Sequence, residues 1–140
     1  MYNLERITII ISDIEKYIEK LKKYSITELS ALSDDKIFHA SSMIVFTILN
    51  RTIDLGNEIL VSENVGAPQS NIDTMFLLAK AGIMNEKEAG ELNKLIEKRN
   101  DFAHFYGSIN EKKLFDLIKN IDVAKKFIEK LKKRILKKIK

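Results

Sequence analysis

Apolar side chains recur at alternating intervals of three and four residues along most of the chain, and this spacing constrains the fold more than any other feature. The first series is Leu4, Ile7, Ile11, Ile14, Ile18 and Leu21. Residues spaced in this way share one face of an α-helix and form the seam between packed helices. No segment alternates apolar and polar residues at every second position, as a half-buried β-strand does. The pattern therefore predicts an all-α protein.

Four further helical segments follow the first. They cover roughly residues 35–62, residues 71–81, a stretch that opens after Asn85, and residues 110–139. Asn85 and Glu88 resemble a capping box, which marks where the fourth helix begins. Gly66 and Pro68 mark the one clear break, which we interpret as a loop within the domain. About five helices with short connections predict an up-and-down bundle, with residues 1–140 forming a single domain.

Composition excludes several classes of protein. The chain has no cysteine, which rules out disulfides, thiol catalysis and cysteine-ligated zinc, and its two histidines are 65 positions apart. No apolar run approaches the roughly 18 residues of a membrane span. Glu5 and Arg6 interrupt any signal-peptide pattern at the N-terminus. We therefore expect a cytoplasmic protein that uses neither a metal nor a cofactor.

Charge is segregated along the chain. Residues 125–140 contain nine basic side chains and one acidic side chain, a local charge of +8, whereas the rest has 15 basic and 19 acidic residues. A positive end on a negative body can attract a polyanion. A solvent-exposed helix end rich in cations also suits the helix dipole. The sequence leaves both interpretations open.

The segment from Arg99 to Tyr106, RNDFAHFY, departs from the apolar pattern. Leu92, Leu95 and Ile96 mark the buried face of a helix, and the same face continues at Arg99. An unpaired guanidinium is costly to bury. Arg99 therefore needs a partner, a cavity or a subunit boundary.

Arg99 and His104 together suit the cleavage of a phosphodiester without a metal. A histidine can take a proton from a ribose 2′-hydroxyl or return one to the leaving oxygen. An arginine can stabilise the charge that grows on phosphate oxygens. One histidine cannot easily serve as both base and acid, so we expect two copies to face each other across a dimer axis. The alternative is that Arg99 and His104 only tie the helix end to a neighbouring helix by hydrogen bonds.

Four residues follow the pattern R-N-x-x-x-H-x-Y, namely Arg99, Asn100, His104 and Tyr106. This pattern resembles the R-x4-H-x-Y motif of HepT-like toxins in the HEPN superfamily. The stretch from Asp54 to Asn57 is similar to the D-x-G-N stretch of the same group. The order of the helices and the loop with Pro68 also fit. The likeness covers roughly residues 36–130.

The resemblance implies a homodimer that pairs its motifs into one cleft and cleaves RNA without a metal, with Arg99 and His104 as catalytic residues. It also implies a cognate antitoxin, a minimal nucleotidyltransferase that transfers AMP from ATP to Tyr106. The added anion would repel RNA from the cleft. Asn100 would orient His104 or the phosphate.

Two other interpretations belong to different classes. In the first, the protein is a non-catalytic helical partner that binds a nucleotidyltransferase or nucleotides through the motif. In the second, it is a structural assembly protein in which Arg99 serves stability. Asp54 and Asn57 are expected only as cleft or dimer residues. The position of the basic C-terminal end relative to RNA stays open.

Overall fold

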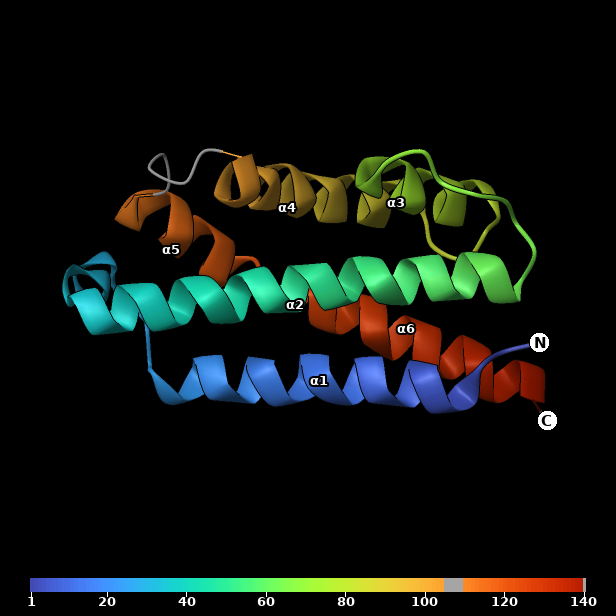
Figure 1. Ribbon diagram of the computed structural model, residues 1–140, viewed down its shortest axis with the longest axis horizontal. Coiled ribbons are helices and arrows are strands. Elements are labelled where there is room, and N and C mark those ends of the chain that lie inside the picture. Colours follow the sequence, from blue (N-terminus) through green and yellow to red (C-terminus); the bar gives the residue numbers. More distant parts are fainter. Residues whose placement is uncertain (105–109, 140) are drawn as a thin grey trace.

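The computed structural model describes residues 1–104 and 110–139, and within 101–104 the helical backbone alone. Figure 1 shows the arrangement of its helices. They are α1 (Leu4–Lys23), the 3-10 helix η1 (Leu29–Ser33), α2 (Asp35–Ser62), α3 (Asn71–Lys80), α4 (Glu86–His104), α5 (Glu111–Lys119) and α6 (Asp122–Ile139). The described residues contain no strand, so the predicted all-α class is confirmed.

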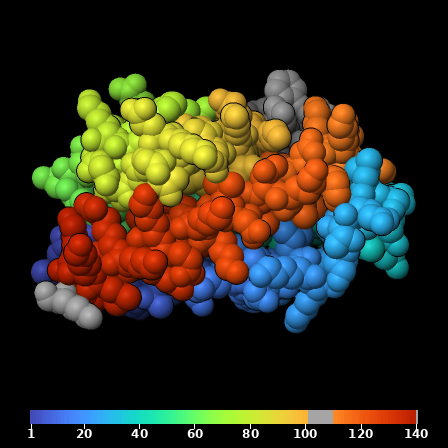
Figure 2. Space-filling view, turned by 180° about the vertical axis from the view of Figure 1, so that it is seen from behind, coloured from blue at the N-terminus to red at the C-terminus, as the bar shows by residue number. Residues whose placement is uncertain are grey.

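The 28-residue helix α2 forms the centre of the bundle. In Figure 1, α1 lies on one side of α2, and α3 and α4 lie on the other. The reverse view in Figure 2 shows α6 between α1 and α4. Six apolar side chains of α2 have no exposed surface: Val45, Ile48, Leu49, Leu55, Ile59 and Leu60. They join buried residues of the surrounding helices in one apolar core.

The predicted capping box is confirmed and sets the start of α4. The backbone N–H of Asn85 donates to the Glu88 carboxylate at 3.0 Å, and the backbone N–H of Glu88 donates to the Asn85 side-chain oxygen at 2.8 Å. At the start of α5, the Asn110 side chain accepts from the backbone N–H of Lys113. These side chains satisfy N–H groups that have no partner within their helix.

The structure divides the single helix expected over residues 110–139 into α5 and α6. The side-chain amide of Asn120 donates to the Asp116 carbonyl at 2.7 Å, and its backbone N–H donates to the Leu117 carbonyl at 3.1 Å. An asparagine that bonds to nearby backbone groups in this way competes with continued helix. Apolar spacing continues through the break at Ile121, which is why periodicity alone predicts one helix.

Close packing of α3 against α2 depends on Gly56. A Cβ placed on Gly56 would lie 2.9 Å from Cγ2 of Thr74 and 3.3 Å from Cδ1 of Leu78. Beside it, the Thr74 hydroxyl donates to the side-chain oxygen of Asn57 at 2.7 Å. Two residues of the D-x-G-N stretch are therefore used to hold α3 on α2.

Among the described residues, no helix combines the length and the apolar character needed to cross a membrane.

Candidate functional site

The site is built around Arg99, near the end of α4. Leu92, Leu95 and Ile96 are at most 3% exposed, and they place the same face of α4 against the core. Arg99 follows on that face and is half-buried. The sequence therefore predicted its position correctly, and the structure shows what surrounds it.

The guanidinium of Arg99 lies over an aromatic ring instead of beside a carboxylate. Its Cζ is 6.0 Å from the centroid of the Phe46 ring on α2. Its Nε is buried, and within the described part of the chain it has no hydrogen-bond partner and no carboxylate forms an ion pair with the guanidinium.

Burial lowers the pKa of Arg99, yet a guanidinium stays protonated at neutral pH. The contact with Phe46 is attractive, worth about 0.5–2 kcal/mol, but it satisfies none of the N–H donors. The site thus holds a fixed cation whose Nε lacks an acceptor among the described residues.

Asn100 and His104 occupy the same end of α4. Asn100 is half-buried, and His104 is the last residue of the helix. One helical turn separates the backbones of these two residues. The His104 side chain and Tyr106 lie outside the described residues, so their expected roles stay predictions.

The structure does not bring Asp54 and Asn57 to Arg99 within one subunit. They follow Phe46 on α2 by eight and eleven residues, which is about 12 and 16 Å along the helix axis. Asp54 lies 3.4 Å from the guanidinium of Arg51, which also forms an ion pair with Asp13 at 2.7 Å. Their expected place in a cleft or dimer interface remains a prediction.

Two residues of α2 that the sequence pattern did not single out belong to this region. Phe46 carries the contact to Arg99, and Met43, one turn earlier, is 63% exposed. Phe46 is partly buried at the margin of the apolar face of α2, whereas Met43 lies on the side of the helix that faces away from the core. Nothing in the sequence distinguishes them until α4 is placed across α2.

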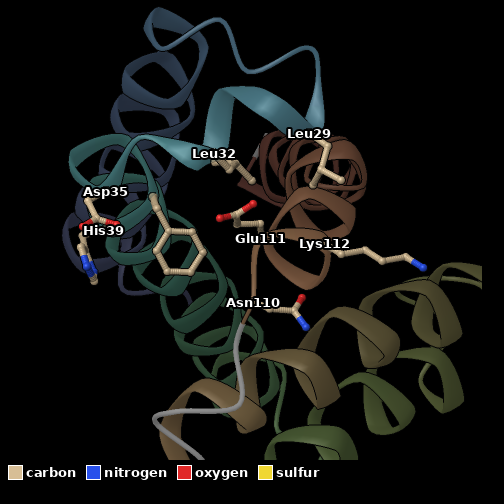
Figure 3. Close-up of a pocket in the computed structure, with 8 residues that line it drawn as sticks. Leu29, Leu32, Asp35, His39, Asn110, Glu111 and Lys112 are labelled. Atoms are coloured by element: carbon tan, nitrogen blue, oxygen red, sulfur yellow. The ribbon is translucent and has the colours of Figure 1, made fainter.

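A hollow of about 490 Å³ lies where the chain re-enters the described residues after the motif (Figure 3). It is lined by residues of η1, α2 and α5: Leu29, Leu32, Asp35, Phe38, His39, Asn110, Glu111 and Lys112. In Figure 3, Lys112 extends away from the other labelled side chains. With two carboxylates and one ammonium group, this hollow is poorly suited to a phosphate.

No group of three or more His, Cys, Asp or Glu side chains among the described residues is arranged to hold a metal ion.

Several solved structures share the fold of this chain. The chain superposes on the cytosolic protein YutE of unknown function from Bacillus subtilis with a TM-score of 0.86 and 22% identity, covering 99% of this chain and 95% of YutE. It superposes on the tri-AMPylated HEPN toxin of Shewanella oneidensis, solved in complex with its MNT antitoxin, with a TM-score of 0.82 and 22% identity, over 94% and 98% of the two chains. A toxin–antitoxin structure with AMP-PNP gives 0.81 and 21%, over 90% and 96%. The fold is therefore the helical bundle of HEPN toxins.

A family model makes the assignment more specific. The model of the family described as ribonuclease HepT-like matches residues 14–131. The chain therefore belongs to the HepT-like family, and the resemblance read from its motif is confirmed. No curated protein sequence matches it significantly.

Proposed function

We propose that this protein is the toxin of a toxin–antitoxin pair and cleaves RNA without a metal through Arg99 and His104. The observation that carries the proposal is the half-buried guanidinium of Arg99, whose Nε has no partner among the described residues. A phosphate oxygen would supply the missing acceptor and charge. The description of the matching family as a ribonuclease supports the reaction. The similar toxin–antitoxin structures support the biological setting.

The proposed reaction needs a base, an acid and a cation. His104 of one subunit takes the proton of the ribose 2′-hydroxyl, and the 2′-oxygen attacks the adjacent phosphorus. The 5′-oxygen leaves and takes a proton from the second His104, which gives a 2′,3′-cyclic phosphate and a 5′-hydroxyl. The Arg99 guanidinium stabilises the charge on the phosphate oxygens during the transfer. Asn100 orients His104 or the phosphate.

The two histidines of this scheme require a homodimer. The surface of α2 next to the site supports a homodimer. Met43 is 63% exposed there, beside the partly buried Phe46, whose ring contacts the Arg99 guanidinium. A second copy that covers Met43 would remove this apolar side chain from water. Pairing two such surfaces places the motif ends of both α4 helices around one phosphate. Asp54 and Asn57 lie further along the same helix, at the margin of this interface.

Neutralisation is proposed to occur at Tyr106. A nucleotidyltransferase antitoxin directs the phenol oxygen to the α-phosphorus of ATP, so that a phosphodiester to AMP forms and pyrophosphate leaves. The similar Shewanella oneidensis toxin is described as tri-AMPylated and in complex with an MNT antitoxin, which supports this step. The similar YutE is described as cytosolic, which supports action in the cytoplasm.

RNA cleavage by purified protein tests the proposal. Wild type is expected to cut total tRNA in the presence of EDTA, and His104→Ala is expected to lose this activity. His39→Ala is the matched control, because His39 is the other histidine of the chain and is exposed on α2. Absence of cleavage by wild type whose intact mass shows no added AMP would favour the non-catalytic partner instead.

Arg99→Leu separates a functional arginine from a structural one. Leaving a buried donor unsatisfied costs about 1–3 kcal/mol, which exceeds the cation–π contribution of about 0.5–2 kcal/mol over most of its range. We expect the variant to lose cleavage while its free energy of unfolding rises by about 1 kcal/mol, measured by urea denaturation. A marked loss of stability would support the structural assembly protein.

A further inference from the structure

The structure divides the basic residues of the C-terminal helix into two groups. Of the nine basic side chains in residues 125–140, four form ion pairs with carboxylates of other elements. The pairs are Lys130 with Glu88, Lys132 with Glu15, Arg134 with Glu63, and Lys138 with Glu63. These cations hold α6 against α1, α4 and the end of α2, so their role is to stabilise the bundle.

The second group has no such partner. Lys125, Lys126, Lys133 and Lys137 form no ion pair with any described carboxylate, and Lys140 lies outside the described residues. Three of them, Lys126, Lys133 and Lys137, are spaced by seven and four residues and so share one face of α6. All three are exposed. We call this face the lysine stripe.

The lysine stripe points away from the core. The buried residues of α6 are Ala124, Phe127, Ile128, Leu131 and Ile135, and they occupy the opposite side of the helix. Figure 2 shows α6 on the surface along nearly its whole length. At 1.5 Å per residue, the three lysines are separated along the axis by about 10 and 6 Å. They form a row of point charges open to solvent.

The helix dipole does not account for this row. Cations are favoured within the last turn of a helix, which covers Lys137 but neither Lys126 nor Lys133. Lys126 lies close to the N-terminal end of α6, where the dipole disfavours a cation. The dipole therefore accounts for Lys137 at most, and Lys126 and Lys133 need another explanation.

The near end of the lysine stripe lies close to the motif helix. Lys126 lines a small crevice together with Glu88, Glu91 and Leu92 of α4. Glu88 is paired with Lys130, so a phosphate would meet Lys126 on the outer, solvent-exposed side of α6 and not in this crevice. Leu92 precedes Arg99 by seven residues, which is two turns or about 10 Å on the same face of the helix. The Lys126 end of the lysine stripe is therefore the end directed towards the half of α4 that holds Arg99 (Figure 1).

We propose that the lysine stripe binds the phosphate backbone of the RNA substrate and guides it to Arg99. This inference rests on the proposed ribonuclease function and adds where the substrate lies. The three ammonium groups are separate point charges on flexible side chains. The RNA backbone, which repeats its negative charge, can pair with all three of them, whereas a single carboxylate can pair with only one. An anionic membrane fits less well, because the exposed apolar residues of α6, Leu136 and Ile139, lie on the flank towards α1.

The test measures binding of a fluorescent RNA as a function of salt, with His104→Ala as the common background so that no RNA is consumed. The stripe variant combines Lys126→Gln, Lys133→Gln and Lys137→Gln. The control variant combines Lys16→Gln, Lys20→Gln and Lys23→Gln, which removes the same charge from exposed positions of α1.

Each phosphate contact with a single strand contributes about 0.7 to the slope of log K against log salt. The stripe variant is expected to lower this slope by about 2 and, for lines that converge at 1 M, to weaken binding by about 100-fold at 0.1 M. The control is expected to keep the slope of its parent. All six lysines are exposed, and the control loses in addition only the contacts of Lys16 and Lys20 with the Tyr17 ring, so thermal unfolding should be little changed in either variant.

An unchanged slope in the stripe variant overturns the inference, and so does an equal reduction in the control. Loss of binding to anionic vesicles in the stripe variant, with RNA binding intact, would assign the stripe to a membrane. The nuclease proposal is tested separately. Wild type that binds RNA through the lysine stripe but never cuts it would support the binding inference and contradict the nuclease proposal. Wild type that cuts RNA while the stripe variant binds normally supports the nuclease alone.

Discussion

Glu63, at the C-terminal end of α2, is the most tightly held carboxylate among the described residues. Its oxygens accept from the Arg134 guanidinium at 2.8 and 2.7 Å and from the Lys138 ammonium at 3.2 Å, and the Tyr2 hydroxyl also donates to it. Its side chain is 9% exposed. These donors connect the N-terminal segment and α6 to the end of α2. The ionisation of Glu63 therefore affects how firmly these three parts of the bundle are held together.

The hydrogen bonds from Arg134 lower the pKa of Glu63 from 4.5 to about 2, against the opposing effect of burial. Burial, followed by the bond to Glu63, raises the pKa of Tyr2 to about 12. Because the pKa of Glu63 is lower in the folded state, its ionised form stabilises the fold above pH 4.5. This stabilisation is lost as the pH falls from 4.5 towards 2. The full contribution is about 3 kcal/mol, and about 2 kcal/mol of it disappears between pH 5 and pH 3.

Glu63→Gln removes the titrating group and leaves the shape of the side chain. We expect the variant to be less stable than wild type at pH 7, and the difference in free energy of unfolding to shrink by about 2 kcal/mol between pH 5 and pH 3. Urea denaturation followed by far-ultraviolet circular dichroism, at one protein concentration, measures both curves.

Glu19→Gln is the control for this experiment, because Glu19 is 68% exposed and should give a curve nearly parallel to that of wild type. If the curves of Glu63→Gln and wild type were also parallel from pH 5 to pH 3, the ion pairs around Glu63 would not contribute as argued.

The remaining predictions concern packing, the interface and helix capping. Gly56→Ala should lower the free energy of unfolding by about 1 kcal/mol, since its Cβ would meet Thr74 at 2.9 Å; Gly90→Ala, with nothing within 4 Å, should raise it by about 0.5–1 kcal/mol in the same urea assay. Met43→Glu should shift the protein to a monomer in light scattering, whereas Phe76→Glu, equally a change at an exposed apolar residue, should not; a dimer that survives Met43→Glu would exclude this face of α2. Asp34→Ala should cost about 1 kcal/mol by denaturation, because Asp34 accepts from two backbone N–H groups at the start of α2.

The helices were predictable because their signals are local. Apolar residues at helical spacing define the buried face of α1. The side chains of Asn85 and Glu88 cap α4 through hydrogen bonds between residues only three positions apart. Such interactions need no knowledge of the rest of the fold. The division of α5 from α6 depends instead on whether Asn120 bonds to its own backbone, which the apolar pattern does not report.

The site was predictable only as far as a single helix defines it. Periodicity places Arg99 on the apolar face of α4, but Phe46 reaches it from a helix more than fifty positions away. In the same way, Asn57 reads as a polar residue near the apolar face of α2, and its actual partner is Thr74 on α3. Long-range contacts of this kind depend on the angle at which helices cross, and many sequences with the same periodicity would pair them differently.

The same kind of long-range contact determines which cations are paired. The sequence shows nine basic residues at the C-terminal end, and the fold uses four of them in ion pairs that hold α6 in place. Among the described residues, Lys126, Lys133 and Lys137 form no ion pair on the outside, and Arg99 forms none within the bundle. A protein that needed these charges only for stability would gain by pairing them or, at Arg99, by replacing the arginine with an apolar residue. One RNA strand that runs along α6 and ends at Arg99 would supply negative charge both to the lysine stripe and to the Arg99 guanidinium.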